Sequence, residues 1–493
     1  MALARSGGER GGTPIVSQPA EYDVAIIGAG VVGAAIAREL SRYDLRTILI
    51  EARDDVGTGT SKANTAIRHT GFDAKPGSLE SALLRRGFPI LASYAEETGI
   101  PLEMTGGLLI AWDAEQLAAL AGIAERSRAN GYSRARPVAV DELYRRESHL
   151  GAGALGALEI PDEGIICPFT TPLALATDAV VNGVRLVLGS PVSGAESRDG
   201  RYALHLQRRQ VVSRWVVNAT GLAADVIDAM FGRQRFTVTP RRGQLIVFDK
   251  FARRLVHSVL LPVPSAITKG VLIAPTVFGN VLLGPTAEDQ HDRSDTATTA
   301  AGLAALLGKG QRIVPALVEE EVTALYAGLR AATEHSDYQI AAFPDQRYVS
   351  VGGIRSTGLS ASMGIAAYVV DLLVDAGLAL RPRETPRSVR MPPIGEAMQR
   401  PYRDPQAIDS DGDYGEIICH CERVTRGDIS ASAHAPIPAR NLDGLRRRTR
   451  AMLGRCQGFY CSAEVTATLA RLTGQRPEHL LALDREASGG DAR

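Results

Sequence analysis

The chain has 493 residues, enough for two or three domains with buried cores. Its 55 basic and 55 acidic residues cancel, which argues against nucleic acid or an anionic membrane surface as the main partner. No uninterrupted apolar run approaches the ~18 residues of a membrane-spanning helix, and residues 1–20 lack the apolar core of a signal peptide, so we expect a disordered leader and a cytoplasmic protein without direct membrane insertion.

A dinucleotide-binding motif follows the leader. Val24–Ile27 is a short apolar run typical of a buried strand, and helical periodicity then continues to Leu40. A second predicted strand, Thr47–Ile50, ends at Glu51, whose carboxylate can accept a hydrogen bond from a ribose. Glycines in this setting allow a tight turn, close approach to a pyrophosphate and close helix–strand packing. The glycines in G-x-G-x-x-G spacing are Gly28, Gly30 and Gly33. The motif predicts a dinucleotide without separating FAD from NAD.

A polar loop and two helices come next. Residues 57–78 are rich in Gly, Ser, Thr and Asn, so we expect a functional loop there. Helical periodicity covers Leu79–Thr98 and Ala114–Asn130, with a strand predicted between them at Gly107–Trp112. Further strands are predicted at Arg185–Leu188, Tyr202–Gln207 and Trp215–Asn218.

The middle of the chain has a different pattern. Three strands predict an antiparallel sheet, which we interpret as a substrate domain inserted into the nucleotide-binding domain. Helical periodicity over Thr298–Ile313 and a short strand over Tyr326–Ala332, which carries Arg330, complete this region. The three strands are Gln244–Phe248, Gly270–Ala274 and Asn280–Gly284.

A second strand–glycine–helix unit returns late in the chain, with a strand at Tyr348–Val351 and a helix from about Ser360 to Asp375. We therefore expect several chain regions to close around one cofactor. Six prolines and little periodicity over 381–416 predict a linker. The predicted organisation is a leader over 1–20, an oxidoreductase unit over 21–380 with its substrate domain mainly from 79–160 and 240–345, the linker, and a C-terminal module over 417–485.

Four of the five cysteines crowd the C-terminal module, whereas Cys167 stands alone. In a chain without an export signal, this clustering favours metal ligation over disulfides. The pattern C-x-C, 34 residues, C-x4-C suits an iron–sulfur cluster better than zinc, whose sites more often use C-x2-C pairs; a structural zinc and metal-free thiols are the alternatives. The four cysteines are Cys419, Cys421, Cys456 and Cys461. Five arginines before the last pair could dock an acidic partner or form a solvated helix face: Arg446, Arg447, Arg448, Arg450 and Arg455.

Residues 417–465, with ICHCERVTRGDI and LRRRTRAMLGRCQGFYC, resemble the small [2Fe–2S] module of the bacterioferritin-associated ferredoxin type, which occurs as an appendage of some FAD dehydrogenases. The resemblance implies that the four clustered cysteines are the cluster ligands. Free-standing ferredoxins of this type usually close with C-x2-C, so the C-x4-C spacing here is similar to the dehydrogenase-attached form.

Residues 22–380 resemble the FAD-dependent D-amino-acid-oxidase superfamily, in particular its glycerol-3-phosphate dehydrogenases and oxidases. The carrying motifs are the glycine motif, GTSKANTAIRHTGFD, VVNATG, TKGVLIAPTVFGNVLLGPT, AGLRAAT and VGGIRSTGLSAS. The resemblance implies an α/β fold, with a Rossmann-like FAD-binding domain, an inserted antiparallel-sheet substrate domain and a small helical C-terminal [2Fe–2S] module. It also implies FAD as cofactor, bound through Gly28, Ala29, Gly30, Gly33, Glu51, Ala52, Thr60, Ser61, Asn64, Thr65, Ala219, Gly221, Gly353, Gly358 and Leu359.

His69 lies in the polar loop, and an isolated histidine is often only structural. Oxidation of an alcohol by a flavin needs a base for the hydroxyl proton, however, and a neutral imidazole suits that role. The resemblance implies that His69 is this base, that Lys269 and Arg330 contact the substrate anion, and that Ser356 assists. His335 is a second, weaker candidate base. Further candidate substrate-binding residues are Thr65, Arg68 and Arg355.

The leading hypothesis is an FAD-dependent dehydrogenase that transfers a hydride from glycerol 3-phosphate to flavin N5 and passes electrons through a [2Fe–2S] cluster. The acceptor is expected to be a protein or a quinone-linked partner subunit, which leaves membrane association through that partner open. One alternative is oxidation of L-2-hydroxyglutarate, another 2-hydroxy acid, an amino acid or a secondary amine. Another is an electron-transfer subunit whose partner holds the substrate site.

Overall fold

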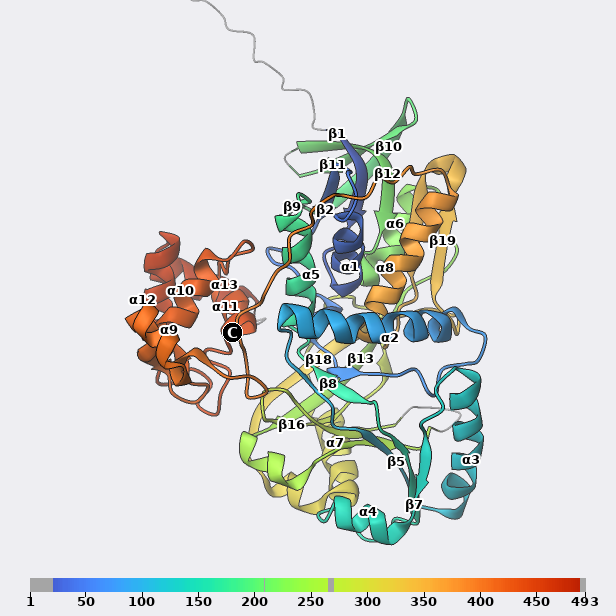
Figure 1. Ribbon diagram of the computed structural model, residues 1–493, viewed down its shortest axis with the longest axis vertical. Coiled ribbons are helices and arrows are strands. Elements are labelled where there is room, and N and C mark those ends of the chain that lie inside the picture. Colours follow the sequence, from blue (N-terminus) through green and yellow to red (C-terminus); the bar gives the residue numbers. More distant parts are fainter. Residues whose placement is uncertain (1–20, 208, 265–269, 488–493) are drawn as a thin grey trace, which may run out of the picture.

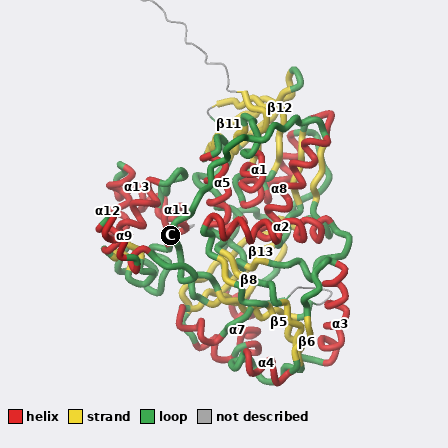
Figure 2. The backbone as a smooth tube through the Cα atoms, in the orientation of Figure 1, coloured by secondary structure: helices red, strands yellow, loops and turns green. Residues whose placement is uncertain are grey.

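The chain folds into three parts in the computed structural model, which describes residues 21–207, 209–264 and 270–487 (Figure 1). A sheet covered by helices lies at the top of the view, a second sheet lies below it, and a small module lies at one side. Figure 2 shows that this side module consists almost entirely of helices and loops. The predicted leader, Lys269 and the C-terminal tail lie outside the described residues.

Strand β1 (Glu21–Ile27) lies inside the upper sheet, hydrogen-bonded in parallel to β2 on one side and β12 on the other. Its last four residues, Val24–Ile27, are buried and all apolar, as is usual in parallel strands that are covered on both faces. β9 and β20 extend the parallel order, while β10, β11 and β19 pair antiparallel. These strands are β2 (Thr47–Ile50), β9 (Arg185–Val187), β10 (Val192–Arg198), β11 (Arg201–Leu206), β12 (Arg209–Asn218), β19 (Gln339–Phe343) and β20 (Tyr348–Gly352).

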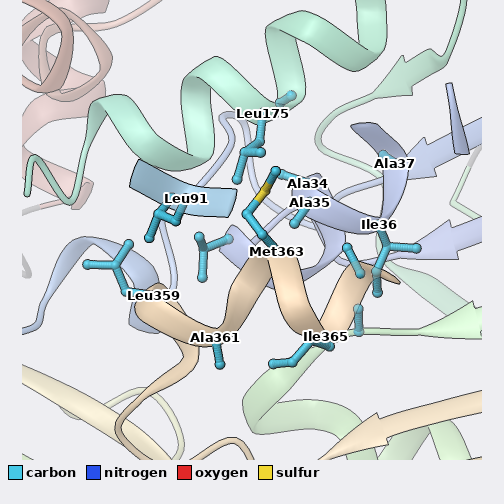
Figure 3. Packing of buried hydrophobic residues seen from close by; sticks show 14 of the residues in the cluster. Ala34, Ala35, Ile36, Ala37, Leu91, Leu175, Leu359, Ala361, Met363 and Ile365 are labelled. Carbon is cyan, nitrogen blue, oxygen red and sulfur yellow. The ribbon is translucent and has the colours of Figure 1, made fainter. Parts of the chain in front are cut away.

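Four helices pack around this sheet through small and apolar side chains. Ala34 and Ala35 of α1 lie in one buried cluster with Leu175 of α5, Leu91 of α2 and Met363 of α8 (Figure 3). Of the helices in the described residues, α8 has the length and apolar composition that a membrane span needs, and 61% of it is buried inside the molecule, as in a core helix. The four are α1 (Val31–Leu40), α2 (Leu79–Thr98), α5 (Thr170–Val181) and α8 (Gly358–Asp375).

The lower sheet has the strand order β17-β13-β16-β15-β14-β5-β7-β6, with β18 also paired to β13. It is antiparallel as predicted, except that β14 and β5 run parallel. Its strands are β5 (Gly107–Ala111), β6 (Arg136–Val138), β7 (Gly156–Ile160), β13 (Thr239–Phe248), β14 (Val259–Pro262), β15 (Leu272–Pro275), β16 (Val281–Gly284), β17 (Glu288–Asp289) and β18 (Val322–Ala332).

Smaller elements connect the two sheets and cover the lower one. A three-stranded sheet of β3 (Ile67–Arg68), β8 (Gly164–Ile166) and β4 (Leu102–Glu103) carries the residues before His69. The remaining helices of these two parts are α3 (Ala114–Ala129), α4 (Val140–Arg146), α6 (Ala224–Met230) and α7 (Ala300–Ile313).

The C-terminal module has its own apolar core, formed by residues such as Ile429, Leu445 and Val465. The segment predicted as a linker without regular structure is in part helical: it contains α9, and Arg400 forms an ion pair with Asp428 of α10 at 3.5 Å. The sequence pattern did not reveal these helical segments because each of them is short. The module contains β21 (Ile417–Cys419), β22 (Val424–Thr425), α9 (Pro405–Ser410), α10 (Arg426–His434), α11 (Leu442–Thr449), α12 (Ser462–Thr473) and α13 (Pro477–Ala487).

Candidate active site and iron–sulfur centre

A cavity of about 890 Å³ runs between the two sheets, and most of the predicted cofactor residues line it. Gly28 has φ +101°, and a Cβ there would lie 2.6 Å from the carbonyl oxygen of Ala219, so the turn after β1 needs glycine. Ala29 N–H donates to Glu51 at 2.7 Å, which fixes the acid at the end of β2. The lining residues that we predicted for the cofactor are Gly28, Gly30, Glu51, Ala52, Thr60, Ser61, Asn64, Thr65, Ala219, Gly221, Gly358 and Leu359.

The polar loop is held against strand β18 of the lower sheet. The Thr60 hydroxyl donates to the carbonyl of Leu329 at 2.8 Å, and Val31 N–H of α1 donates to the Ser61 hydroxyl at 2.9 Å. A Cβ at Gly328 would lie 2.2 Å from the carbonyl oxygen of Ala63, so loop and strand approach each other as closely as glycine allows. These contacts place Arg330, two residues further along β18, in the wall of the same cavity.

Arg330 lies directly opposite Arg241 of strand β13, and both line the cavity. Arg241 forms a bidentate pair with Asp289, at 2.5 and 2.9 Å. Arg330 has no carboxylate partner in the described ranges and donates a 3.4 Å hydrogen bond to the carbonyl of Thr286. Burial and the charge of Arg241 lower the pKa of Arg330 to about 10, so the guanidinium remains charged at neutral pH. A half-buried cation with no carboxylate partner among the described residues is a binding site for an anion.

His69 lies in the cavity wall between two carboxylates. Its Nδ1 is 3.0 Å from Glu163 and its Nε2 is 3.0 Å from Asp73. Burial lowers the pKa of His69, but the charges and hydrogen bonds of Glu163 and Asp73 outweigh it and raise that pKa to about 10. The neutral imidazole that we expected near pH 7 is therefore a cation in this state of the site.

The four clustered cysteines meet in the C-terminal module as two pairs. The Cys461 thiol donates to Cys419, which lowers the pKa of Cys419 to about 6. The Cys421 thiol donates to Cys456, and Cys456 also feels the charge of Cys419, so the two pairs are neighbours. Cys419 and Cys461 are buried, whereas Cys421 and Cys456 are half-buried. Cys167 is buried, and its Sγ forms a hydrogen bond with the Thr170 hydroxyl at 3.1 Å.

Comparison with known proteins then decides the family. Residues 23–372 match the FAD dependent oxidoreductase family, DAO, and residues 417–471 match the BFD-like [2Fe-2S] binding domain.

The chain belongs to the FAD dependent oxidoreductase family.

Relatives within this family align over most of the chain. The glycerol 3-phosphate dehydrogenase of Caloramator mitchellensis is 37% identical and covers 92% of this chain and 95% of its own length. One subunit of the anaerobic glycerol-3-phosphate dehydrogenase of Escherichia coli K12 is 27% identical, covering 91% of this chain and 88% of its own. Among solved structures, the dithionite-reduced L-alpha-glycerophosphate oxidase of Mycoplasma pneumoniae with FAD bound has a TM-score of 0.71 at 27% identity, covering 76% and 99%.

Membership confirms the predicted fold class and cofactors: the chain is an FAD-dependent oxidoreductase, similar to glycerol-3-phosphate dehydrogenases, with FAD and a [2Fe–2S] cluster. The residues present fit FAD, because the glycine turn, the N-terminus of α1 and Glu51 all open onto the long cavity. They also fit a two-iron cluster. No three His, Cys, Asp or Glu side chains converge on a single ion within the described residues, whereas two pairs of thiols suit two irons.

Some predicted site residues do not line the cavity. Arg68 stacks on the ring of Phe88, 3.5 Å from its centroid, and donates to the Phe88 carbonyl at 3.1 Å, so it is turned away from the cavity. His335 is exposed, lies outside the cavity and contacts the carbonyl of Arg235. Three predicted cofactor residues are also absent from the described lining: Ala29, Gly33 and Gly353.

Arg355 and Ser356 line the cavity as predicted, but Arg355 is already engaged, 3.5 Å from Glu80 and donating to the carbonyl of Ser336 at 2.6 Å. Sequence reasoning missed several polar residues of the lining. Asp73, four residues after His69 in the polar loop, could have been found from that spacing, whereas the others gave no local signal. Among those it missed are Asp73, Glu163, Arg241 and Arg293.

Four of the five arginines of the run form ion pairs with carboxylates of the same chain. Arg448 forms a bidentate pair with Asp55, at 2.6 and 2.8 Å, and Arg447 reaches the same carboxylate at 2.6 Å. Asp55 follows Glu51 closely, so the run fastens the module to the loop beside the cofactor cavity. Further pairs join Arg450 to Glu422 and Arg455 to Glu321.

Proposed function

We propose that this flavoprotein oxidises glycerol 3-phosphate and passes the electrons singly, through its [2Fe–2S] cluster, to a partner protein. One observation carries the proposal: Arg330 lies half-buried in the cavity wall, and no carboxylate of the described residues neutralises it. Its neighbour Arg241 has Asp289, so the excess positive charge belongs to Arg330. A phosphate monoester would supply the missing charge and match the fork of the guanidinium.

The roles of the chain's own residues follow from their positions. Arg330, with Lys269 as a second candidate cation, would bind the phosphate, and Thr65 and Ser356 line the same cavity as hydroxyl groups for the rest of the substrate. His69 would take the hydroxyl proton after its Nε2 has lost its own proton. FAD supplies the hydride acceptor when bound, and the cluster supplies a one-electron carrier.

Glycerol 3-phosphate is favoured over a hydroxy acid by the names of the relatives, since those aligned over most of this chain are glycerol 3-phosphate enzymes. The Escherichia coli relative is named as one component of a larger enzyme, which supports an electron acceptor on a separate partner protein here. That partner would determine whether the enzyme, which we expect in the cytoplasm, also associates with a membrane.

An anaerobic titration of the purified holoenzyme tests the proposal. Glycerol 3-phosphate should bleach the flavin absorbance and then reduce the cluster, whereas glycerol, which lacks the anion, should bleach neither at the same concentration. Parallel titrations with L-2-hydroxyglutarate and with glycine test the two alternative substrate classes. Reduction by one of these and not by glycerol 3-phosphate would overturn the substrate assignment; no reduction by any would point to a substrate site on a partner.

A further inference from the structure

Two carboxylates hold His69, and the proposed reaction does not by itself require either of them. Glu163 lies immediately before β8 and its side chain is 0% exposed. It accepts hydrogen bonds from the Thr70 N–H at 2.7 Å and the Thr70 hydroxyl at 2.8 Å, besides its contact with Nδ1 of His69. A fully buried carboxylate with this many donors is fixed in place.

Asp73 differs from Glu163 in its surroundings. It belongs to the polar loop, its side chain is 9% exposed, and it lines the cavity beside Nε2 of His69. The ring therefore has a permanent partner on its buried side and a partner within reach of solvent and substrate on its cavity side. Because a substrate hydroxyl must reach Nε2, the Asp73 contact is the one that has to yield.

We propose that Glu163 is a positioning residue that holds the Nδ1 proton of His69 and thereby presents Nε2 to the cavity, and that Asp73 receives from Nε2 each proton taken from the substrate and releases it to solvent. This rests on the proposed function for the identity of the proton donor, a substrate hydroxyl. The protons balance: the O–H bond breaks as N–H forms at Nε2, the C–H hydride passes to FAD, and the Nε2 proton leaves through Asp73, which restores the free Nε2.

The charged groups around the ring set the direction of the pH effect. Glu163 and Asp73 face His69 from its two sides, Arg68 lies behind Glu163, and Arg330 lines the same cavity. The two carboxylates raise the pKa of His69 to about 10, so removing either charge should lower it towards the ordinary value of 6.5. The fraction of enzyme with a free Nε2 at neutral pH should then rise, even though catalysis in the Glu163 variant is impaired by loss of orientation.

The test uses carbon-13 NMR of the ring carbons in histidine-labelled holoenzyme without substrate, with the signal assigned by His69→Asn. Glu163→Gln and Asp73→Asn should each move the His69 titration to lower pH, and Thr70→Val, which removes one donor to Glu163 but no charge, should move it far less. In steady-state assays, kcat of Glu163→Gln should fall at least ~10-fold, as for other supporting groups of a catalytic histidine, with its pH profile displaced to acid.

An unchanged His69 titration in both carboxylate variants would overturn the proposal, as would a loss of kcat in Glu163→Gln without displacement of its pH profile. Asp73→Asn serves if Glu163→Gln does not fold, since Asp73 lies at the cavity surface. The NMR titration needs no substrate, so it stands even if glycerol 3-phosphate fails to reduce the flavin. Failure of glycerol 3-phosphate to reduce the flavin would contradict the proposed function and leave the roles of Glu163 and Asp73 to the NMR titration.

Discussion

Arginines have opposite roles at two places in this molecule. At the junction of the C-terminal module with the cofactor domain, Arg447 and Arg448 meet Asp55, a carboxylate of the same chain. In the cavity, Arg330 is half-buried, and the described chain offers it no carboxylate. Burial of a charge is costly without compensation, so each site must find its counter-charge somewhere. At the junction the counter-charge is a carboxylate of the protein itself. In the cavity we expect the ligand to supply the counter-charge.

The same difference separates what holds the molecule together from what it binds. The Asp55 cluster ties the iron–sulfur module to the loop that follows Glu51, and thus ties the predicted route of the electrons to the flavin cavity. Arg330 contributes nothing comparable to the fold. Substitutions at the two sites should therefore fail in different assays, the first in stability and the second in substrate binding.

The largest effect is expected for Asp55→Asn. It leaves two buried guanidinium groups with one remaining carboxylate, Asp443, and breaking a buried pair costs about 3–5 kcal/mol. Urea denaturation followed through the cluster absorbance should show that loss. Asp54→Asn is the matched control: Asp54 is exposed and forms a hydrogen bond with Asn441 of the module, so the unfolding midpoint of this variant should stay close to that of the unmodified protein. Equal unfolding midpoints for the two variants would contradict the conclusion that Asp55 holds the module in place.

The next effect is expected for Arg330→Ala. Truncating one partner of a buried charge pair costs about 2–5 kcal/mol, so KM for glycerol 3-phosphate should rise at least ~30-fold. The unfolding free energy should not fall, because the described chain has no carboxylate to leave unpaired. Arg330→Lys keeps the positive charge but loses the two-pronged geometry of the guanidinium. Its KM should therefore lie between that of the unmodified enzyme and that of Arg330→Ala. A stable variant with unchanged KM would remove the observation on which the proposed function rests.

Acid should weaken the junction by protonating Asp55. Burial raises the pKa of Asp55, but the hydrogen bonds and charges of Arg448 and Arg447 outweigh it and hold that pKa below its ordinary 3.8. A depressed carboxyl pKa contributes stability that is complete above the ordinary value and is lost as the pH falls through the lower, folded value. Unfolding free energy measured as a function of pH should fall in this range for the unmodified protein and fall less for Asp55→Asn. Parallel curves would contradict the shift.

The sequence predicted those parts of the fold in which one segment determines its own structure. The glycine turn, α1, α2 and α8 follow from local spacing and periodicity, and the four cysteines from their clustering. What it missed are pairings between distant segments: Glu163 lies 94 positions from His69, and Arg448 lies 393 positions from Asp55. Neither carboxylate carries a local mark of its partner. The arginine run was visible, but its counter-charge was not, so an acidic partner and a solvated helix face both stayed open.

The smallest effect is expected for Arg455→Gln, which tests whether burial, and not ion pairing as such, distinguishes the junction. Arg455 also joins the module to the rest of the chain, through Glu321 next to β18 of the lower sheet, but both side chains are about half exposed. Solvent screens such a pair, so its contribution should be close to nothing. The urea midpoint of Arg455→Gln should match that of the unmodified protein. If it fell as far as that of Asp55→Asn, the module would be held by the sum of its ion pairs rather than by the buried carboxylate.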